Sequence, residues 1–305
     1  MLAQAARART KRKPPKGALA RRRAKAGGQR RERASSRGAH RPPRAAIAVD
    51  GKTSRGARAA GGRAPHLVAA VAHSGVVLAQ RQVSEKSNEI TAFVPLLKDL
   101  PLAGVVITTD AMQTQRSHAQ FLRQVKDAHF IFPVLENQPT LFGQLDRLDW
   151  KSVPVTAWTL DTDRGRHELR TIQVLPTPPG LRFPHVGQVF LVERTVTANG
   201  KTSYQAMLYV TSLTPDQASP ADLLAYVRGH WTVESLHWVR DVVFAEDASH
   251  IRTGNASRVM ATIRNTVISL LRVAGVTNIA AALRHNARKD RRVLKHLGLL
   301  TSKNG

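Results

Sequence analysis

The sequence predicts an α/β domain, because short apolar runs typical of strands alternate with helical patterns from Ala45 onward. One of these runs, 105–109, is apolar almost throughout, as is typical of a strand buried on both faces of a sheet. In the stretch 151–213, four runs of strand type follow one another with no helical pattern between them. We therefore expect a mixed sheet with flanking helices and an all-β insertion before the last helices.

The first half of the domain has the predicted order strand, hairpin, helix, strand, helix, strand, helix. His73-Ser74-Gly75 joins two apolar runs and is a hairpin signal, and Ser87 is a suitable N-cap for the helix after it. Glycines and arginines after Asp50 indicate a basic loop. The expected elements are strands at 45–49, 66–72, 76–83, 105–109 and 129–134, and helices at 87–97, 117–125 and 140–148.

The second half begins with the predicted β insertion and ends in helices. Asn199-Gly200 is a strong hairpin signal within the insertion. Ser219 and Pro220 suit the N-cap and first position of the next helix, and Gly275 suits the end of the one after it. The expected elements are strands at 156–160, 169–175, 189–196 and 203–213, a helix from 220 onward, a helix at 256–273 and a basic end at 284–295.

Residues 1–44 differ from the rest, because 16 Lys and Arg residues there face a single acid, Glu32. Large apolar residues are nearly absent, and no helix or strand period is present. This composition predicts a disordered basic tail. The sequence thus divides into a tail at 1–44 and one domain at 45–305, with the β insertion at 151–213 inside it.

The formal net charge of +26 and a sequence pI of about 11.6 indicate a partner that is a polyanion, first of all DNA or RNA. An acidic membrane surface is the weaker alternative, since no apolar stretch approaches the ~18 residues of a spanning helix. The N-terminus lacks the apolar segment of a signal peptide, so a cytoplasmic location is expected. The chain has no cysteine, which excludes disulfides, thiolate zinc sites and cysteine nucleophiles.

Two aspartates end predicted strands of the sheet. Asp50 follows 45–49 and Asp110 follows 105–109. If the strands are adjacent and parallel, their carboxylates meet at one edge, where like charges are unfavourable unless a cation bridges them. Mg²⁺ suits such a pair, and two metal ions would support phosphodiester chemistry without a side-chain nucleophile. The alternative is that each aspartate only caps the turn after it.

Glu234 lies in the predicted helix after the insertion, at the margin of an apolar stripe. The stripe is formed by Leu224, Val227, Trp231 and Trp238, and we expect the two tryptophans to lie in the core. A glutamate at this margin points toward the domain and needs a metal or a cationic partner. The alternative is that the side chain snorkels to the solvent or forms an ion pair with a nearby arginine such as Arg228.

Several basic residues near these carboxylates are candidates for DNA contacts. Lys52, Arg55 and Arg58 follow Asp50 directly and could bind phosphates, or could form only a solvated basic loop. His230 and His237 share the face of Glu234, and we interpret them as polar contacts of the helix or as site residues. Glu246-Asp247 is interpreted as a cap or turn. The residues expected to bind DNA are Lys52, Arg55, Arg58, Lys86, Arg228 and His237.

The chain resembles the H-repeat-associated (ISAs-type) insertion-sequence transposases. The resemblance is carried, in order, by 48–53 (AVDGKT), 86–90 (KSNEI), 109–111 (TDA), 137–141 (NQPTL), 230–241 (HWTVESLHWVRD), 246–249 (EDAS) and 252–256 (RTGNA). It implies an RNase H-like domain whose DDE triad is Asp50, Asp110 and Glu234. It also implies two Mg²⁺ ions (or Mn²⁺), the terminal inverted repeats and target DNA as partners, a homodimer on DNA, and a nucleoid-associated cytoplasmic enzyme.

The chain also departs from this family's pattern. The basic tail stands where family members carry a helical region, and Leu135-Glu136 replaces a lysine and a small residue. Against a broader related signature, His230 and Asp241 replace an arginine and a lysine. These departures leave an alternative to an active transposase, namely a truncated, catalytically inactive DNA-binding remnant.

Overall fold

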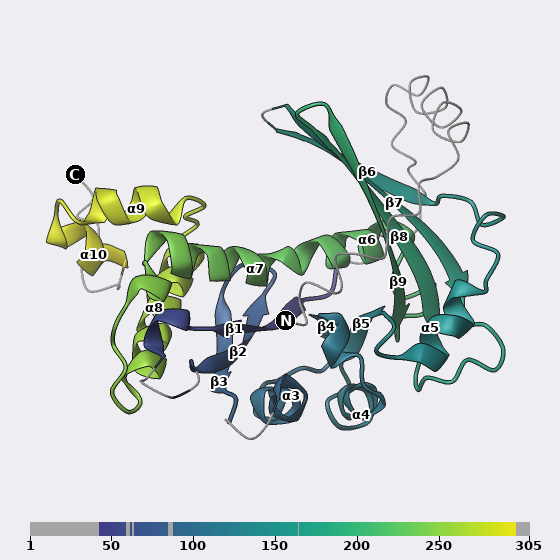
Figure 1. Ribbon diagram of the computed structural model, residues 1–305, viewed down its shortest axis with the longest axis horizontal. Coiled ribbons are helices and arrows are strands. Elements are labelled where there is room, and N and C mark those ends of the chain that lie inside the picture. Colours follow the sequence, from purple (N-terminus) through teal and green to yellow (C-terminus); the bar gives the residue numbers. More distant parts are fainter. Residues whose placement is uncertain (1–42, 59–61, 63, 85–87, 164, 297–305) are drawn as a thin grey trace.

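The computed structural model describes residues 43–58, 62, 64–84, 88–163 and 165–296. Within them, nine strands form one mixed sheet in the order β3-β2-β1-β4-β5-β9-β8-β7-β6, flanked by helices (Figure 1). The predicted mixed α/β architecture is therefore confirmed. The predicted basic tail lies outside the described residues except for positions 43 and 44, as do Ser87 and the candidate Lys86.

The first half of the sheet combines a meander with two parallel strands. The meander strands pair antiparallel, and the two later strands run parallel to the first. The five strands are β1 (Ala46–Thr53), β2 (His66–Ala72), β3 (Val77–Gln82), β4 (Val106–Thr109) and β5 (His129–Val134). Val49 pairs with Thr109, so β1 and β4 reach the same edge of the sheet in register.

The second half of the sheet is an antiparallel meander that continues the first half. Its last strand pairs antiparallel with β5, so these strands do not form a separate sheet. The turn at Asn199 and Gly200 has φ angles of 49° and 71°, as the Asn-Gly signal predicts. The strands are β6 (Ala157–Asp163), β7 (Arg166–Pro176), β8 (Gln188–Ala198) and β9 (Lys201–Thr211).

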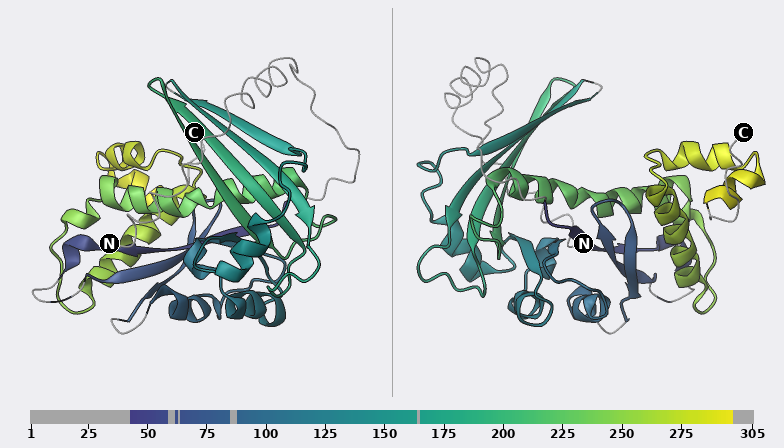
Figure 2. Two further views of the ribbon diagram at one scale, coloured as in Figure 1. Left: turned by 45° about the vertical axis from the view of Figure 1, so that its right-hand side comes forward. Right: turned by 180° about the vertical axis from the view of Figure 1, so that it is seen from behind.

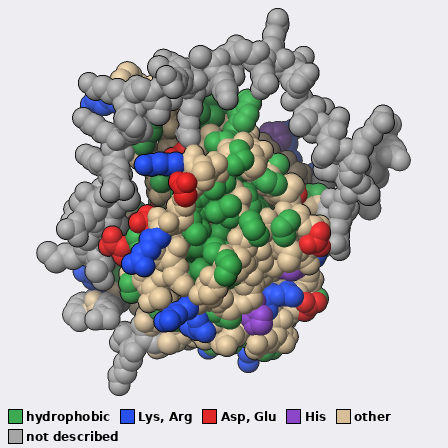
Figure 3. Space-filling model, turned by 90° about the vertical axis from the view of Figure 1, so that its right-hand side faces the viewer, with side chains coloured by type: hydrophobic (Ala, Val, Ile, Leu, Met, Phe, Trp, Pro, Cys, Tyr) green, Lys and Arg blue, Asp and Glu red, His purple; other side chains and the backbone are tan. Residues whose placement is uncertain are grey.

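Figure 2 shows these four strands rising as a long twisted arm at one end of the molecule. We call them the β6–β9 arm. Figure 3 looks at the outer side of the arm, where hydrophobic side chains gather. The exposed large apolar side chains of the arm are Trp158, Leu160, Leu169 and Tyr204.

Helices cover both faces of the sheet (Figure 1). One face carries α3 (Glu89–Leu97), α4 (Arg116–Gln120), which continues as a π-helical turn (Phe121–Val125), and α5 (Pro139–Asp146). The other carries α6 (Pro220–Gly229), α7 (Trp231–Trp238) with a π-helical turn (Val239–Val243), and α8 (Ala256–Val273). The chain continues through α9 (Ile279–Asn286) and α10 (Asp290–His296). Short 3-10 turns span Arg55–Ala57, Ala111–Gln113 and Glu246–Ala248.

The period of two along β1 sends its side chains into two different cores. Ile47 and Val49 are buried against the layer of α3 to α5. Ala48 packs on the opposite face with residues of α7 and α8, including Val233 and Leu236. Because Asp50 has the same parity as Ala48, its side chain lies on the α7 face of the sheet. The small alanine allows the helix to pack closely above it.

The predicted apolar stripe of α7 is wrong at its two tryptophans. Trp231 is 46% exposed and Trp238 is 58% exposed. The buried side of the helix is formed instead by Val233, Leu236 and Val239, which face the sheet and α8. The apolar tryptophans led to the wrong prediction of the buried side. The helix has two apolar stripes, and the tertiary packing decides which of them is covered. Among the described residues, no helix is long and apolar enough to cross a membrane.

Candidate active site

Asp50 and Asp110 lie on neighbouring strands, at the level where β4 ends. Asp50 lies within β1 and Asp110 directly follows β4, and the parallel register places these positions side by side. Burial, followed by the negative charge of Asp110, raises the pKa of Asp50 to about 7. Burial, followed by the charge of Glu89, raises the pKa of Asp110 to about 6. The site therefore holds neighbouring carboxylates in a protein environment that disfavours their charge.

The alternative that the aspartates cap turns holds for one of them. Asp110 Oδ1 accepts a hydrogen bond of 3.2 Å from the backbone N–H of Gln113, so it caps the turn Ala111–Gln113. Asp50 caps no turn, because β1 continues through Thr53, where a basic loop was predicted. Capping fixes the direction of the Asp110 carboxylate and is compatible with a role in the site.

Glu234 lies on α7 on the same side as Asp50, and its charge contributes to the raised pKa of Asp50. Its side chain is exposed, and partial desolvation raises its own pKa against the effect of Arg194. Arg228, the alternative partner, instead forms an ion pair of 2.7 Å with Asp161 of β6. In the part of the chain that the structure describes, no three Asp, Glu or His side chains already form a metal-binding group.

His237 and Lys52, both predicted to bind DNA, lie inside the protein. The Nδ1 atom of His237 is 3.5 Å from Asp50 Oδ2, and burial, with the charges of Arg240 and Lys52, lowers the histidine pKa to about 3. Lys52 is 7% exposed, and its Nζ lies 2.8 Å from Asp241 Oδ2. These contacts favour positioning roles for both residues over direct phosphate contacts. Arg55 and Arg58 are exposed.

Glu246, predicted to be part of a cap or turn, is the acceptor of a buried ionic network. The turn is present, but the side chain is only 3% exposed. It accepts hydrogen bonds from Arg240 Nε and Nη2 at 2.8 and 2.7 Å, from Ser54 Oγ at 2.9 Å and from Arg264 Nη1 at 3.5 Å. We call this set the Glu246 network. It ties the end of β1 to α8 and to the π-helical turn after α7.

Glu89 is a further acidic residue near the two aspartates, and sequence reasoning missed its proximity to them. It is the first residue of α3, and its charge raises the pKa of both Asp50 and Asp110. The only local signal was its place in the run KSNEI, which carries part of the family resemblance. Nothing in the spacing of Glu89 from either aspartate indicates that the three side chains meet.

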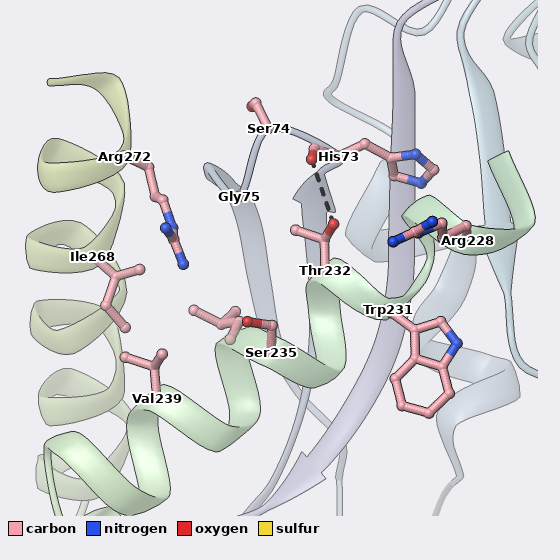
Figure 4. Close-up of a pocket in the computed structure, with 11 residues that line it drawn as sticks. His73, Ser74, Gly75, Arg228, Trp231, Thr232, Ser235, Val239, Ile268 and Arg272 are labelled. Carbon is pink, nitrogen blue, oxygen red and sulfur yellow. Dashed lines mark hydrogen bonds between the residues drawn. The ribbon is translucent and has the colours of Figure 1, made fainter. Parts of the chain in front are cut away.

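A cavity of about 360 Å³ lies on the far side of α7, between this helix, α8 and the turn from β2 to β3 (Figure 4). Arg228 and Arg272 line it together with Trp231, Thr232 and Ser235, and none of its lining residues is acidic. The guanidinium of Arg194 lies 5.3 Å from the ring centroid of Trp231. Cationic and aromatic side chains therefore lie next to the helix that carries Glu234, an arrangement suited to phosphates and bases.

Comparisons with known proteins agree with the resemblance seen in the motifs. The family model described as the transposase DDE domain matches residues 41–270. The chain is 33% identical to the "H repeat-associated putative transposase YhhI" of Escherichia coli K12 over 80% of this chain and 68% of that protein. It is 34% identical to the "Putative transposase YncI" of Escherichia coli O157:H7 over 74% of this chain and 61% of that protein. The chain thus spans about three fifths to two thirds of these relatives.

Proposed function

This chain belongs to the family of transposase DDE domains, and from that premise we propose that it cuts and joins DNA at the ends of an insertion sequence. The proposed triad is Asp50, Asp110 and Glu234. One observation carries the proposal: Asp50 and Asp110 are neighbouring, largely buried carboxylates with pKa values raised to about 7 and about 6. Such a pair is unfavourable by itself and becomes favourable when a cation binds between its members.

The donor atoms present suit magnesium or manganese. Carboxylate oxygens are the ligands that Mg²⁺ prefers, and the basic side chains of Lys52 and Arg240 pair with Asp241 and Glu246 instead. Bound by the triad, two such ions would lower the pKa of a water molecule and stabilise the charge that develops on the phosphate. His237 would keep the Asp50 carboxylate oriented, because its neutral ring contacts Oδ2.

The proposed reaction has two steps at one site. In the first, water attacks the phosphorus at the element's end, the bond to the 3′-oxygen breaks, and a 3′-hydroxyl and a 5′-phosphate result. In the second, the 3′-hydroxyl attacks a phosphodiester of target DNA, and the 3′-oxygen of that DNA leaves with the proton. The second step exchanges one phosphodiester for another, so it needs no other energy source.

The strand order supports an RNase H-like core for this domain. We propose that β3-β2-β1-β4-β5, with β1, β4 and β5 parallel, forms that core within a domain at 45–305. The β6–β9 arm would then be the insertion at 151–213, placed before the helix that carries Glu234. The arm brings Arg194 and Arg170 over α6 and α7, so it would also contribute positive charge beside the site.

For DNA binding we propose four arginines around the site, of which Arg55, Arg58 and Arg228 are exposed and Arg272 is half-buried. Arg55 and Arg58 follow β1, while Arg228 and Arg272 line the cavity behind α7. Lys86 remains a proposed contact and lies outside the described residues. The proposed partners are the terminal inverted repeats and target DNA, bound by a homodimer in the cytoplasm at the nucleoid.

Asp50→Asn tests the proposal. The amide keeps the shape of the side chain but weakens binding of a metal ion, so strand cleavage in Mg²⁺ should be abolished while DNA affinity stays within about threefold. Asp146→Asn, an exposed carboxylate of α5, is the matched control and should cleave normally. Full cleavage by Asp50→Asn would overturn the proposal. Salt-sensitive binding without sequence preference, and no cleavage by the unmodified chain, would identify the inactive DNA-binding remnant instead.

A further inference from the structure

Glu89 is the first residue of α3. Asn88 is the N-cap of this helix, and its side-chain oxygen accepts a hydrogen bond of 3.3 Å from the backbone N–H of Thr91. The cap fixes where the helix begins, and therefore where the Glu89 side chain leaves the backbone. That side chain is only 13% exposed. A glutamate at the first helical position is common on a surface, but this one points into the protein.

The two carboxylate oxygens of Glu89 have different surroundings. Oε1 lies 2.5 Å from His66 Nε2, and the other ring nitrogen of His66 lies 2.7 Å from Thr53 Oγ1. Oε2 is buried and has no hydrogen-bond partner among the described residues. A buried carboxylate oxygen without a partner is unfavourable, so its presence requires a reason. The contact with His66 explains the orientation of the group but not the buried second oxygen.

The carboxylate of Glu89 lies against the backbone next to Asp50. A Cβ atom at Gly51 would be 2.3 Å from Glu89 Oε1 and 2.5 Å from His66 Nε2, so only glycine leaves room for this pair. Gly51 has the opposite parity to Asp50 along β1, so Glu89 approaches the strand from the α3 side while α7 approaches from the other. Its negative charge acts on Asp50 and on Asp110 alike.

We propose that Glu89 is a fourth acidic residue of the site, which binds the divalent cation through Oε2 while His66 holds Oε1. The inference rests on the proposed function of the site and adds one acidic ligand to it. In this arrangement His66 is a positioning residue, since it acts on the cation only through Glu89. The unpartnered oxygen is then the one that faces the cation, and the glycine at position 51 is what lets it approach.

Mn²⁺ binding to the full chain, measured by electron paramagnetic resonance without DNA, tests the proposal. Glu89→Gln keeps an oxygen that can accept from His66 but loses the negative charge, so Mn²⁺ affinity should fall at least about 10-fold, because loss of even an outer-shell partner typically costs about 10- to 100-fold. His66→Gln should lower it less, by under about tenfold. Asp146→Asn should leave it unchanged.

The thermal midpoint of the metal-free protein at pH 8 gives a second readout. Glu89→Gln should raise it, because one of several neighbouring negative charges is removed. A role limited to the first turn of α3 and to pairing with His66 predicts a lower midpoint and unchanged Mn²⁺ affinity, and that result would overturn the inference. If Asp50→Asn loses Mn²⁺ and Glu89→Gln does not, only this inference fails. If the unmodified chain binds no Mn²⁺, both it and the proposed metal site fail.

Discussion

Two groups of acidic side chains lie at the end of β1, and the protein treats them in opposite ways. Asp50, Asp110 and Glu89 lie together, no Lys or Arg among the described residues pairs with either aspartate, and the pKa values of the two aspartates are raised to about 7 and about 6. Glu246 is at least as buried, which by itself raises its pKa, but the bonds and charges of Arg240 and neighbouring donors outweigh burial and lower it.

This difference in pKa arises because the Lys and Arg side chains of the region form ion pairs outside the candidate site. Lys52, Arg240 and Arg264 all lie near β1 or α7, yet each pairs with an acid outside the candidate site. Glu168 in the β6–β9 arm shows the same pattern, since hydrogen bonds from Arg194 and Arg166 lower its pKa to about 2. The acids paired with cations stabilise the fold, whereas the aspartates keep a local excess of negative charge that suits a metal ion.

The largest effect should come from breaking the Glu246 network. Glu246→Gln leaves Arg240 buried with its charge uncompensated, and loss of one partner of a buried pair costs about 3–5 kcal/mol of unfolding free energy. Urea denaturation at pH 7 would measure it, with Asp146→Asn as the exposed control. A loss below about 1 kcal/mol would mean that the network is not a main stabilising element.

Removing the charge of Asp50 should increase the stability of the metal-free protein, whereas removing the charge of Glu246 should decrease it. Because the folded pKa of Asp50 is raised from 3.8 to about 7, its favourable contribution is present below about pH 4 and is lost as the pH rises through 7. Asp50→Asn should therefore raise the unfolding free energy of the metal-free protein more at pH 8 than at pH 4. The difference between the two pH values should be up to about 4 kcal/mol, at ~1.4 kcal/mol per pKa unit.

Unfolding of both proteins by urea across pH 4 to 8 would test this effect. Saturating Mg²⁺ should remove most of the difference, because it binds the carboxylates of the unmodified chain. If the unmodified chain is as stable at pH 8 as the variant without metal, burial and the charge of Asp110 do not raise the pKa of Asp50 as the structure indicates.

The smallest expected effect is a loss of DNA affinity on replacing an arginine that is paired with neither group of acids. Arg272 lines the cavity behind α7, and within the described part of the chain it donates hydrogen bonds to the backbone carbonyls of Val276 and Thr277. Arg272→Gln should lower DNA affinity by about 1 kcal/mol and reduce the slope of log affinity against log salt by about 0.9, the loss of one phosphate contact. Fluorescence anisotropy at several salt concentrations measures both, and Arg284→Gln on α9 is the control. An unchanged slope would remove the cavity from the DNA surface.

Elements with a clear local pattern were predicted closely. The strand at 129–134 and the helix at 256–273 have the predicted bounds, because a short apolar run and a glycine just beyond a helix end are local signals. The strand end before Asp110 was also predicted, whereas β1 continues past Asp50 to Thr53. The buried side of α7 was predicted wrongly, since Trp231 and Val233 are both plausible core residues and lie on different sides of the helix.

The sequence by itself determined the family, the α/β order and the three candidate carboxylates, because these depend on the period of the backbone and on motifs within a few residues. Only the tertiary structure decided which acids receive cations. Glu246 meets Ser54 across 192 positions, and Glu89 meets His66 across 23. Such long-range contacts depend on how strands and helices pack. Burial and neighbouring charges then set the pKa of each carboxylate. The same residue type is a structural ion in one place and a candidate ligand in the other.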